Sequence, residues 1–382
     1  MQHSQLSDTS QHSPEEWADL LCVSDSTDDR QTLASLIDAI RSADQAQKNG
    51  SSPCSLSVAN ILRSLQVDQT TLIATLFCDA RLSEYYTLER IRTEYSETIS
   101  NLVKNVRWLQ NFKPPASGEA MTEPQQAERL RRMLLAMVDD VRAVLIILAW
   151  RLQQLRILNN TESHERTVIA RETMDIFAPL ANRLGISQLK WEMEDRSFHY
   201  LEPTTYKKIA KSLDDRRIER ETYLKQFTDD FHAILHDEGI ESEVYGRPKH
   251  IYSIWRKMQR KQLTIEQLYD LRAVRVIVED IRECYDILGL VHMHWKHVPE
   301  ELDDYINNRK PNGYQSLHTV VIGPGGKYVE IQIRTREMHE VAETGVAAHW
   351  SYRNGERVEN RFAVDPVKWI SALTERLDDD QD

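Results

Sequence analysis

The chain has 382 residues, of which 41% are hydrophobic and 28% are charged, and its formal net charge is −12. This length predicts two domains, each large enough to bury a core of its own. The acidic balance excludes a protein that coats nucleic acid with bulk positive charge, so any anionic ligand must meet a local basic patch.

The cysteines and the first residues of the chain bear on its compartment. Four cysteines are present without any paired spacing, which argues against a disulfide framework and against a zinc knuckle. Residues 1–16 are polar, and no stretch is as long and apolar as a signal peptide or a membrane helix. We therefore expect a cytoplasmic protein that does not bind a membrane.

Residues 14–184 carry a helical pattern with almost no strand signal. Apolar residues recur at three- and four-residue spacing in four segments, which are 32–43, 57–65, 87–109 and 127–158. The run Lys-Pro-Pro-Ala-Ser-Gly at 113–118 predicts a loop between helices. The pattern predicts an all-α domain over residues 1–185.

The pattern changes after residue 185. Residues 186–203 predict a helical linker that ends at Pro203, and residues 204–239 predict one long charged helix that ends at Gly239. Strand and helix signals then alternate as far as residue 364. Residues 365–382 predict the start of a linker helix to C-terminal regions that are absent. The fold class expected is α+β, with a second domain over 204–364.

A β-hairpin over residues 316–334 is the most informative stretch of this second domain. Its second arm alternates, with Val329, Ile331 and Ile333 on one face and Glu330, Gln332 and Arg334 on the other. The polar face could be an ordinary solvated one. The preceding loop favours a nucleotide site, because it combines a turn-forming Asn-Gly pair with an aromatic ring and flanking basic groups, Lys310, Asn312, Tyr314 and His318.

A basic segment precedes the hairpin. Between Tyr245 and Ile265 there is no acidic residue, and the segment holds Arg247, Lys249, Arg256, Lys257, Arg260 and Lys261. In a helix that starts near Lys249, the residues Lys249, Ser253 and Lys257 share one face, with Arg247 at the entry turn. A solvated charged face is the alternative, but such faces usually mix signs, so we expect a phosphate site.

Two carboxylates are candidate metal ligands. Asp270 opens a buried strand and Glu330 lies in the hairpin, so the two could be neighbours on adjacent strands and hold Mg²⁺ between them and nucleotide phosphates. The histidines His292, His294 and His297 lack a matched carboxylate, and we do not expect a metal there.

With these residues in view, the chain resembles the RelA/SpoT homologues, the bacterial stringent-response enzymes that make and degrade the alarmones ppGpp and pppGpp. Five runs carry the resemblance in the family's order: GRPKHIYSI at 246–254, YDLRAVR at 269–275, KPNGYQSLH at 310–318, EIQIRT at 330–335 and GVAAHW at 345–350. The resemblance implies a nucleotidyltransferase-like mixed sheet flanked by helices. It also implies transfer of the β,γ-pyrophosphate of ATP to the 3′-hydroxyl of GDP or GTP.

The resemblance also implies site residues. Those for ATP are Arg247 and Arg275 on the adenine, and Lys249, Ser253 and Lys257 on the phosphates. Those for the guanine nucleotide are Tyr314, which stacks on the base, and Lys310, Asn312 and His318. For catalysis, Asp270 and Glu330 hold Mg²⁺, and Glu330 and Gln332 orient or deprotonate the 3′-hydroxyl. His318 is a further catalytic residue.

The first domain resembles the family's His-Asp hydrolase, which binds Mn²⁺, but the ligands have changed. The positions of the family's ligands are occupied here by Cys54, Cys78, Asp79, Leu82, Ser83 and Trp150. Asp79 alone remains as an oxygen ligand, and one carboxylate does not hold a hydrolytic metal. Two cysteines could in principle form a soft-metal site. We nevertheless expect a degenerate hydrolase domain without Mn²⁺.

Three functions stay open on the sequence. The leading hypothesis is a synthetase with an inactive hydrolase domain, and the alternatives are a bifunctional synthetase and hydrolase or a nucleotide-binding regulatory module without catalysis. The resemblance implies ATP and GDP or GTP as ligands. It further implies ribosomes and uncharged tRNA as partners, through the absent C-terminal regions.

Overall fold

The structure is a computed structural model, and it describes residues 12–23, 26–46, 54–111, 140–215, 217–247, 249–265, 272–350, 352–353 and 356–357. The chain divides into two compact units, one formed by Met1–Asn182 with Val346–Asp382 and the other by Arg183–Gly345. Among the described residues, no helix is long and apolar enough to cross a membrane.

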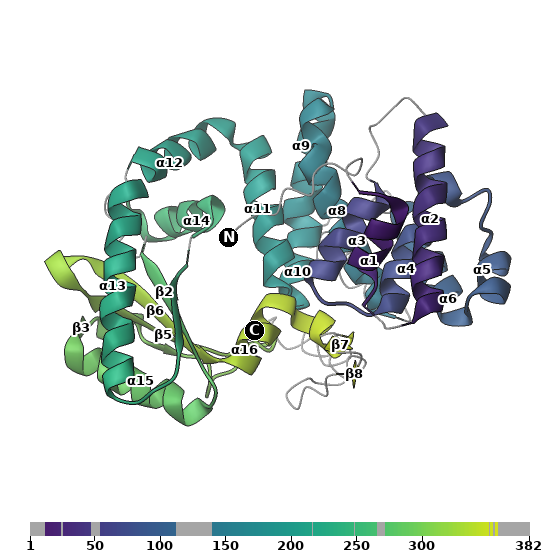
Figure 1. The fold of residues 1–382 in the computed structure, drawn as a ribbon. Helices are drawn as coiled ribbons and strands as arrows, with labels where there is room; N and C mark the ends of the chain where they lie inside the picture. The colour runs from purple at the N-terminus through teal and green to yellow at the C-terminus, as the bar shows by residue number, and fades with distance from the viewer. Residues whose placement is uncertain are drawn as a thin grey trace, which may run out of the picture. The chain divides into compact units, whose positions relative to one another are not determined.

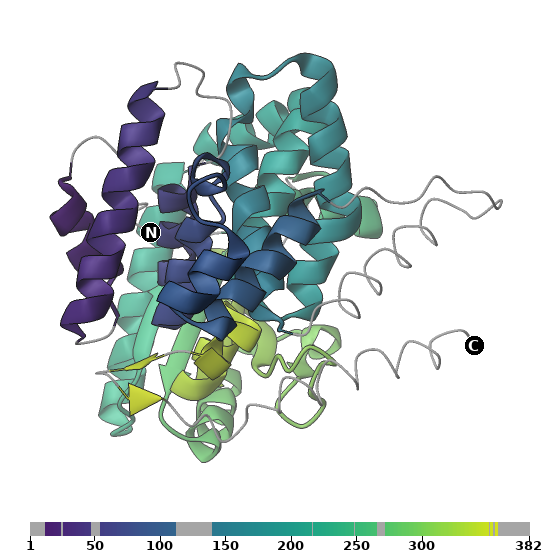
Figure 2. The same ribbon diagram turned by 90° about the vertical axis from the view of Figure 1, so that its right-hand side faces the viewer.

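The first unit is helical, as predicted (Figures 1 and 2). The apolar residues that recur at three- and four-residue spacing form its core. Its helices α3, α4, α6 and α8 pack against one another. Its helices are α1 (Pro14–Leu21), α2 (Thr27–Ala46), α3 (Ser55–Ser64), α4 (Gln69–Phe77), η1 (Ala80–Leu82), α5 (Leu88–Glu94), α6 (Glu97–Asn111), α8 (Arg142–Ile157), η2 (Leu158–Asn160), α9 (Ser163–Glu172), η3 (Thr173–Phe177) and α10 (Ala178–Arg183). Short elements η7 (Gly345–Trp350), β7 (Tyr352–Arg353) and β8 (Glu356–Arg357) follow the second unit in the chain.

Two helix predictions in this unit need correction or lie partly outside the described residues. The helical segment predicted over 87–109 consists of two helices, α5 and α6, because Ser96 accepts a hydrogen bond from the amide of Ile99 at 3.1 Å at the start of α6. Of the helix predicted over 127–158, the described part is α8. The loop predicted at 113–118 and the tail at 365–382 lie outside the described residues.

The second unit is an α+β unit. Its elements are α11 (Ser187–Leu201), α12 (Pro203–Asp215), α13 (Arg217–Asp237), β1 (Glu243–Gly246), α14 (Ile251–Lys261), β2 (Ala273–Val278), α15 (Ile281–His294), β3 (Lys296–His297), η5 (Pro299–Glu301), β4 (Asp303–Asp304), β5 (Leu317–Ile322), η6 (Pro324–Gly326), β6 (Tyr328–Thr335) and α16 (Arg336–Thr344). The segment predicted as a linker, 186–203, contains α11. The one long helix predicted over 204–239 is wrong, because the structure divides it into α12 and α13.

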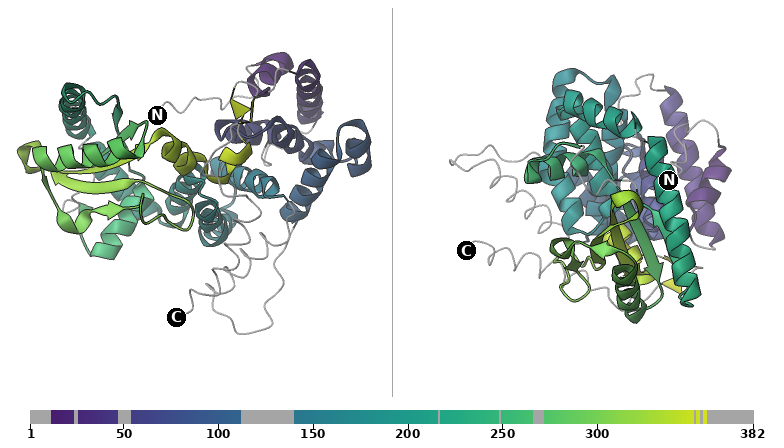
Figure 3. Two further views of the ribbon diagram at one scale, coloured as in Figure 1. Left: turned by 90° about the horizontal axis from the view of Figure 1, so that it is seen from below. Right: turned by 90° about the vertical axis from the view of Figure 1, so that its left-hand side faces the viewer.

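The sheet of this unit is mixed and can be followed in Figure 3. Its strand order is β1-β2-β6-β5-β3, with β4 paired to β5, and the β2–β6 pair is parallel while the others are antiparallel. Apolar residues of β2, β5 and β6 pack with α13 and α15 into one core cluster. The helices therefore cover one face of the sheet.

The alternation predicted for the hairpin is confirmed on its apolar face. Val329, Ile331 and Ile333 are fully buried in the core cluster. The register places Gln332 between Arg275 of β2 and His318 of β5, so polar residues of three strands lie side by side. The opposite face of the sheet is thus the polar one.

Candidate active site

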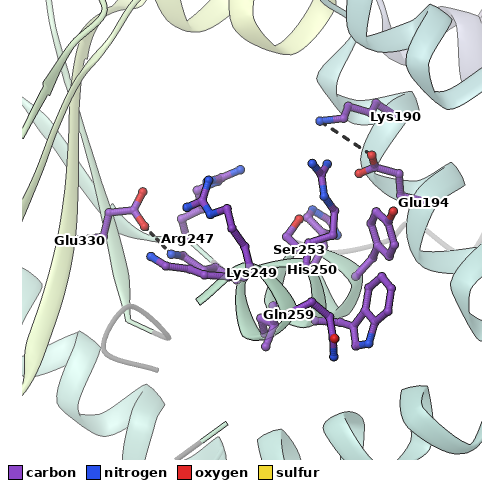
Figure 4. A pocket seen from close by; sticks show the side chains of 14 residues that line it. Lys190, Glu194, Arg247, Lys249, His250, Ser253, Gln259 and Glu330 are labelled. Carbon is purple, nitrogen blue, oxygen red and sulfur yellow. Dashed lines mark hydrogen bonds and ion pairs between the residues drawn. The ribbon is translucent and has the colours of Figure 1, made fainter. Parts of the chain in front are cut away.

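A cavity of about 770 Å³ lies between α14, α11 and β6 (Figure 4). Its lining is strongly cationic, with two carboxylates, Glu194 and Glu330, on different elements. The cationic side chains are Lys190, Arg247, Lys249, Arg256, Lys257 and Arg260. A cavity with this excess of positive charge suits a polyanion such as a polyphosphate.

The helix α14 supplies three of the six cationic side chains, Arg256, Lys257 and Arg260. Its apolar side is anchored by Ile254, which is 3% exposed and packs with Phe198 and Ile209. Arg247, Lys249, Ser253 and Lys257 all line the cavity, as the sequence predicted. The predicted helix start near Lys249 is wrong, because α14 begins at Ile251 and Lys249 precedes its N-cap residue, His250.

Glu330 of β6 lies at the cavity and is paired with a lysine. Its carboxylate accepts hydrogen bonds from Lys249 Nζ and from Gln332 Nε2, the latter at 2.7 Å. Burial by itself raises the pKa of Glu330, but the charge of Lys249 and the hydrogen bonds outweigh burial and hold the pKa at about 2. At neutral pH this carboxylate is therefore a hydrogen-bond acceptor and a potential metal ligand, and a weak base.

His318 connects Glu330 to the loop that precedes β5. Its Nδ1 lies 3.8 Å from Glu330 Oε1, and its Nε2 lies 2.8 Å from the hydroxyl of Tyr314. Burial lowers the pKa of His318 to about 4, so the ring is neutral at pH 7. Lys310 Nζ lies 4.0 Å from the ring centroid of Tyr305, an aromatic residue that the sequence did not single out.

The loop owes its shape to Asn312 and Gly313. The side chain of Asn312 accepts a hydrogen bond from the amide of Tyr314 at 3.2 Å, and Gly313 adopts φ +82°, a conformation that favours glycine. This turn sets the ring of Tyr314 edge-on to Tyr305 and His318, with centroids 6.2 and 5.8 Å away. The predicted acceptor residues thus lie together on one loop.

Arg275 is placed differently from Arg247. It is 5% exposed, is not among the described residues that line the cavity, and donates to Glu343 Oε1 at 3.0 Å. The same oxygen accepts from Arg334 at 3.1 Å. Arg247, by contrast, reaches the cavity, and its guanidinium carbon lies 4.6 Å from the ring centroid of Trp191.

The predicted metal ligands are described in part. Asp270 lies outside the described residues, so Glu330 is the one candidate Mg²⁺ ligand with a described geometry. Across the described part of the chain, no group of three or more His, Cys, Asp or Glu side chains could hold a metal ion. Mg²⁺ in nucleotide sites is commonly bound by one or two carboxylates together with phosphates, and Glu330 at a cationic cavity fits that donor set.

The histidine cluster has other partners. His292 Nε2 lies 2.9 Å from the buried hydroxyl of Thr319, and its ring stacks on His297 at 4.0 Å. His294 Nδ1 lies 2.9 Å from the carbonyl oxygen of Leu290.

Sequence reasoning missed the part of the cavity that α11 supplies. Lys190 and Glu194 lie one turn apart on this helix and form an ion pair at 3.9 Å (Figure 4). Glu194 is 8% exposed, and burial raises its pKa. No local pattern links these residues to α14, because they lie more than fifty positions before it in the chain.

In the first unit, the carboxylate of Asp79 is fully engaged. It is 2% exposed, accepts hydrogen bonds from Arg81 Nε and Nη2 at 2.7 Å each, and accepts from the amide of Ser55 at 3.3 Å. Burial raises its pKa, but the bonds to Arg81 outweigh burial and lower it. Arg81 therefore binds both oxygens of the Asp79 carboxylate.

The other positions that the hydrolase resemblance singled out lie beside Asp79 in the sequence, just before α3 or on α8. Cys78 is 3% exposed, and burial raises its thiol pKa to about 12, which disfavours a metal-binding thiolate. Leu82 is buried, and Ser83 is exposed with its hydroxyl on the carbonyl of Ala80 at 2.7 Å. Cys54 and Trp150 are half-buried.

Comparison with known proteins matches both units. Residues 246–357 match the region found in RelA/SpoT proteins, and residues 32–187 match an HD domain. The GTP pyrophosphokinase of Escherichia coli K12 is 48% identical over 321 residues, which are 83% of this chain and 43% of that protein. A Synechocystis protein, described as a probable guanosine-3′,5′-bis(diphosphate) 3′-pyrophosphohydrolase, is 43% identical over 85% of this chain and 42% of its own length.

Among solved structures, the small alarmone synthetase 1 from Bacillus subtilis matches 44% of this chain and 93% of its own, with 24% identity and a TM-score of 0.31. The chain spans less than half the length of the curated relatives named above. The two family regions occur in order, an HD domain and then the RelA/SpoT region, and the identity extends through both of them. The chain belongs to the RelA/SpoT family.

Proposed function

We propose that this chain is a (p)ppGpp synthetase, which transfers the β,γ-pyrophosphate of ATP to the 3′-hydroxyl of GDP or GTP. The observation that carries the proposal is the cavity lined by cations, with the carboxylate of Glu330 at its edge and Lys249 bound to it. Such a reaction needs positioning and charge neutralisation more than covalent help from the protein.

The donor nucleotide would lie along α14. Lys249, Ser253 and Lys257 face the cavity and would bind the polyphosphate, and Arg247 would lie against the adenine. In the reaction the 3′-oxygen forms a bond to the β-phosphorus, the bond from that phosphorus to the α,β-bridging oxygen breaks, and AMP leaves. The hydroxyl proton is released to solvent. The cationic lining stabilises the charge that builds up on the transferred group and on AMP.

Glu330 would orient the attacking 3′-hydroxyl and, with Asp270, hold Mg²⁺. Its low pKa keeps it ionised, and Gln332 fixes one of its oxygens by a hydrogen bond. When bound, Mg²⁺ would supply further neutralisation of phosphate charge. Lys249, bound to Glu330, is placed so that its ammonium can be shared between the carboxylate and an arriving phosphate.

The acceptor nucleotide would bind at the 310–318 loop. Tyr314 would stack on guanine, with Lys310, Asn312 and His318 completing the contacts. The hydrogen bond between Tyr314 and His318, together with the 3.8 Å approach of His318 to Glu330, links the acceptor loop to the carboxylate. An acceptor bound there would bring its ribose toward Glu330.

We further infer that the HD-type unit does not hydrolyse ppGpp. The resemblance to the Synechocystis protein favours the bifunctional alternative. Against it stand the pairing of Asp79 with Arg81 and the buried, protonated Cys78. A purely regulatory module is disfavoured by Glu330 and Tyr314, since binding alone requires no carboxylate at the phosphates. The whole protein would work in the cytoplasm with ribosomes and uncharged tRNA as partners.

One experiment separates these functions. The protein is incubated with ATP, GDP and Mg²⁺, and the nucleotides are resolved by chromatography, with reactions lacking ATP or GDP as controls. A synthetase yields ppGpp and AMP in equal amounts, and a regulatory module yields neither. Incubation with ppGpp and Mn²⁺ then tests the hydrolase, for which we expect no release of pyrophosphate. Repeating the first reaction with ribosomes that carry uncharged tRNA tests the proposed partners.

A further inference from the structure

The phosphate-binding helix α14 is capped by another helix. Its N-cap residue, His250, makes no side-chain hydrogen bond to the first turn. The carboxylate of Asp195 on α11 fills this place, because it accepts from the amide of Tyr252 at 2.8 Å and from the amide of Ile251 at 3.3 Å. A carboxylate at this point satisfies two unpaired amides and interacts favourably with the helix dipole.

The ring of Trp191, one turn before Asp195, supports two residues at the entry to α14. It stacks on His250 with centroids 5.3 Å apart and planes 26° apart, and the guanidinium carbon of Arg247 lies 4.6 Å from its centroid. Stacking and cation–π attraction of this kind restrict a long arginine side chain. Arg247 and His250 both line the cavity, so this ring acts on the cavity through them.

A third residue on the same face of α11 fixes the two helices together. Phe198 is 2% exposed and packs on Tyr252 and Trp255, with centroids 5.5 and 4.9 Å away. Trp191, Asp195 and Phe198 follow the spacing i, i+4, i+7, which is one stripe of a helix. On this stripe, Trp191 stacks beside the start of α14, Asp195 caps it, and Phe198 packs against its apolar side.

We propose that Asp195 and Trp191 are positioning residues for the donor nucleotide. Asp195 fixes the start of α14, and thereby the direction in which Lys249 and Ser253 face. Trp191 holds Arg247 against the cavity. The inference rests on the proposed function and assigns these residues to the ATP half of the site. The predicted acceptor contacts come from residues 310–318, which lie far from Asp195 and Trp191 in the sequence.

The occupied cap also decides where phosphate can bind on α14. The N-terminus of a helix is ordinarily an anion site, but here it is filled by a carboxylate of the same chain. The donor's phosphates are therefore expected beside α14, at Ser253 and Lys257 on the helix and at Lys249 just before it.

The test compares Asp195→Ala with Asp195→Asn. For each, the KM values for ATP and for GDP are measured, together with the Kd for a non-hydrolysable ATP analogue by calorimetry. Loss of the cap should raise both the KM for ATP and the analogue Kd about five- to tenfold and leave the KM for GDP unchanged. Asparagine caps helices about as well as aspartate, so Asp195→Asn should stay within about twofold of the wild type.

The matched control is Arg196→Ala, which removes an ion pair on the same helix, to Glu192 at 2.7 Å, and should change none of the three constants. Equal rises for ATP and GDP in Asp195→Ala, or no rise in either, would overturn the positioning role. Should Asp195→Ala fail to fold, Trp191→Leu carries the test with the same expected selectivity for ATP. A wild type that binds the analogue without forming ppGpp refutes the proposed function, and the binding constants still decide the positioning role; a wild type that does not bind the analogue refutes both.

Discussion

Asp79 in the helical unit and Glu330 in the sheet unit are both shielded carboxylates paired with a cation, but the two pairs have different surroundings. Asp79 pairs with Arg81, two residues along the chain, and accepts backbone amides as well. Glu330 pairs with Lys249, 81 residues away, at a cavity that holds five further cations. Both carboxylates have lowered pKa values. The pKa shift alone therefore does not distinguish a structural pair from one available for chemistry.

The two pairs differ in the kind of cation and in whether a cavity adjoins the carboxylate. Arginine forms a rigid, two-point contact with a carboxylate, whereas lysine is a compact charge on a flexible stem that can turn toward another anion. Asp79 is enclosed by buried neighbours such as Cys78 and Leu82. A carboxylate is thus available for chemistry when its partner can be shared and a cavity adjoins it.

Glu330→Gln should have the largest effect, and it tests the pair of Glu330 with Lys249. The amide keeps the shape of the side chain but loses the charge that binds Lys249 and that would bind Mg²⁺, so we expect a loss of at least ~10²-fold in ppGpp formation. The variant should still fold at the assay temperature, with a lower melting temperature because Lys249 loses its partner. Asp270→Asn should behave alike. The control is Asp286→Asn on the exposed side of α15. Turnover near the wild-type rate in Glu330→Gln would contradict the assignment.

Arg81→Ala tests the pair of Asp79 with Arg81. It leaves the buried carboxylate of Asp79 without its partner, which should lower the free energy of unfolding by about 3–5 kcal/mol in urea titrations at pH 7. The deficit should shrink below about pH 4, because a carboxyl with a lowered folded pKa stabilises above its unfolded pKa and loses this contribution as pH falls. Arg92→Ala breaks an exposed pair with Glu89 and should cost less than about 1 kcal/mol. Equal losses of unfolding free energy in the two variants would mean that the Asp79–Arg81 pair stabilises the fold no more than an exposed ion pair does.

Tyr314→Ala sharpens the division of the sheet unit into donor and acceptor parts. Stacking of a base on an aromatic ring contributes about 1–3 kcal/mol, so the KM for GDP should rise about 5- to 150-fold with little change for ATP. Tyr314→Phe keeps the ring but loses the hydrogen bond to His318, and a rise of at most about tenfold is expected. If the KM values for ATP and GDP rise together in Tyr314→Ala, the ring does not bind the acceptor nucleotide selectively.

The smallest effect concerns the pH dependence of stability around His318. Burial holds its folded pKa at about 4, below the ordinary value of 6.5, so the neutral ring stabilises the fold above pH 6.5 and this contribution is lost as pH falls toward 4. Between pH 6.5 and 5.5 the loss should be about 1 kcal/mol. Urea unfolding of the wild type and of His318→Gln across this window measures it, and parallel pH profiles would show that His318 does not titrate as inferred.

The sequence alone determined the fold class, because helical and strand periodicities leave their mark on short windows of residues. The same locality predicted that Val329, Ile331 and Ile333 are buried. It also predicted Lys249, Ser253 and Lys257 on one helix face, but Lys249 precedes the first residue of the helix, Ile251, although all three line the cavity. Asp79 was also singled out from the sequence, by the resemblance to a hydrolase domain. Arg81, which binds its carboxylate, was not, because an arginine two residues away has no pattern of its own.

The tertiary structure decided the contacts between residues far apart in the chain. The bond of Lys249 to Glu330 depends on the sheet register and on the position of α14, and no local pattern specifies either. The same is true of Asp195, which caps a helix that begins 56 residues later. Arg275 was expected at the adenine from its motif, yet its guanidinium is bound by Glu343. Periodicity fixes which way a side chain faces on its own element, whereas its partner depends on how the elements pack against one another.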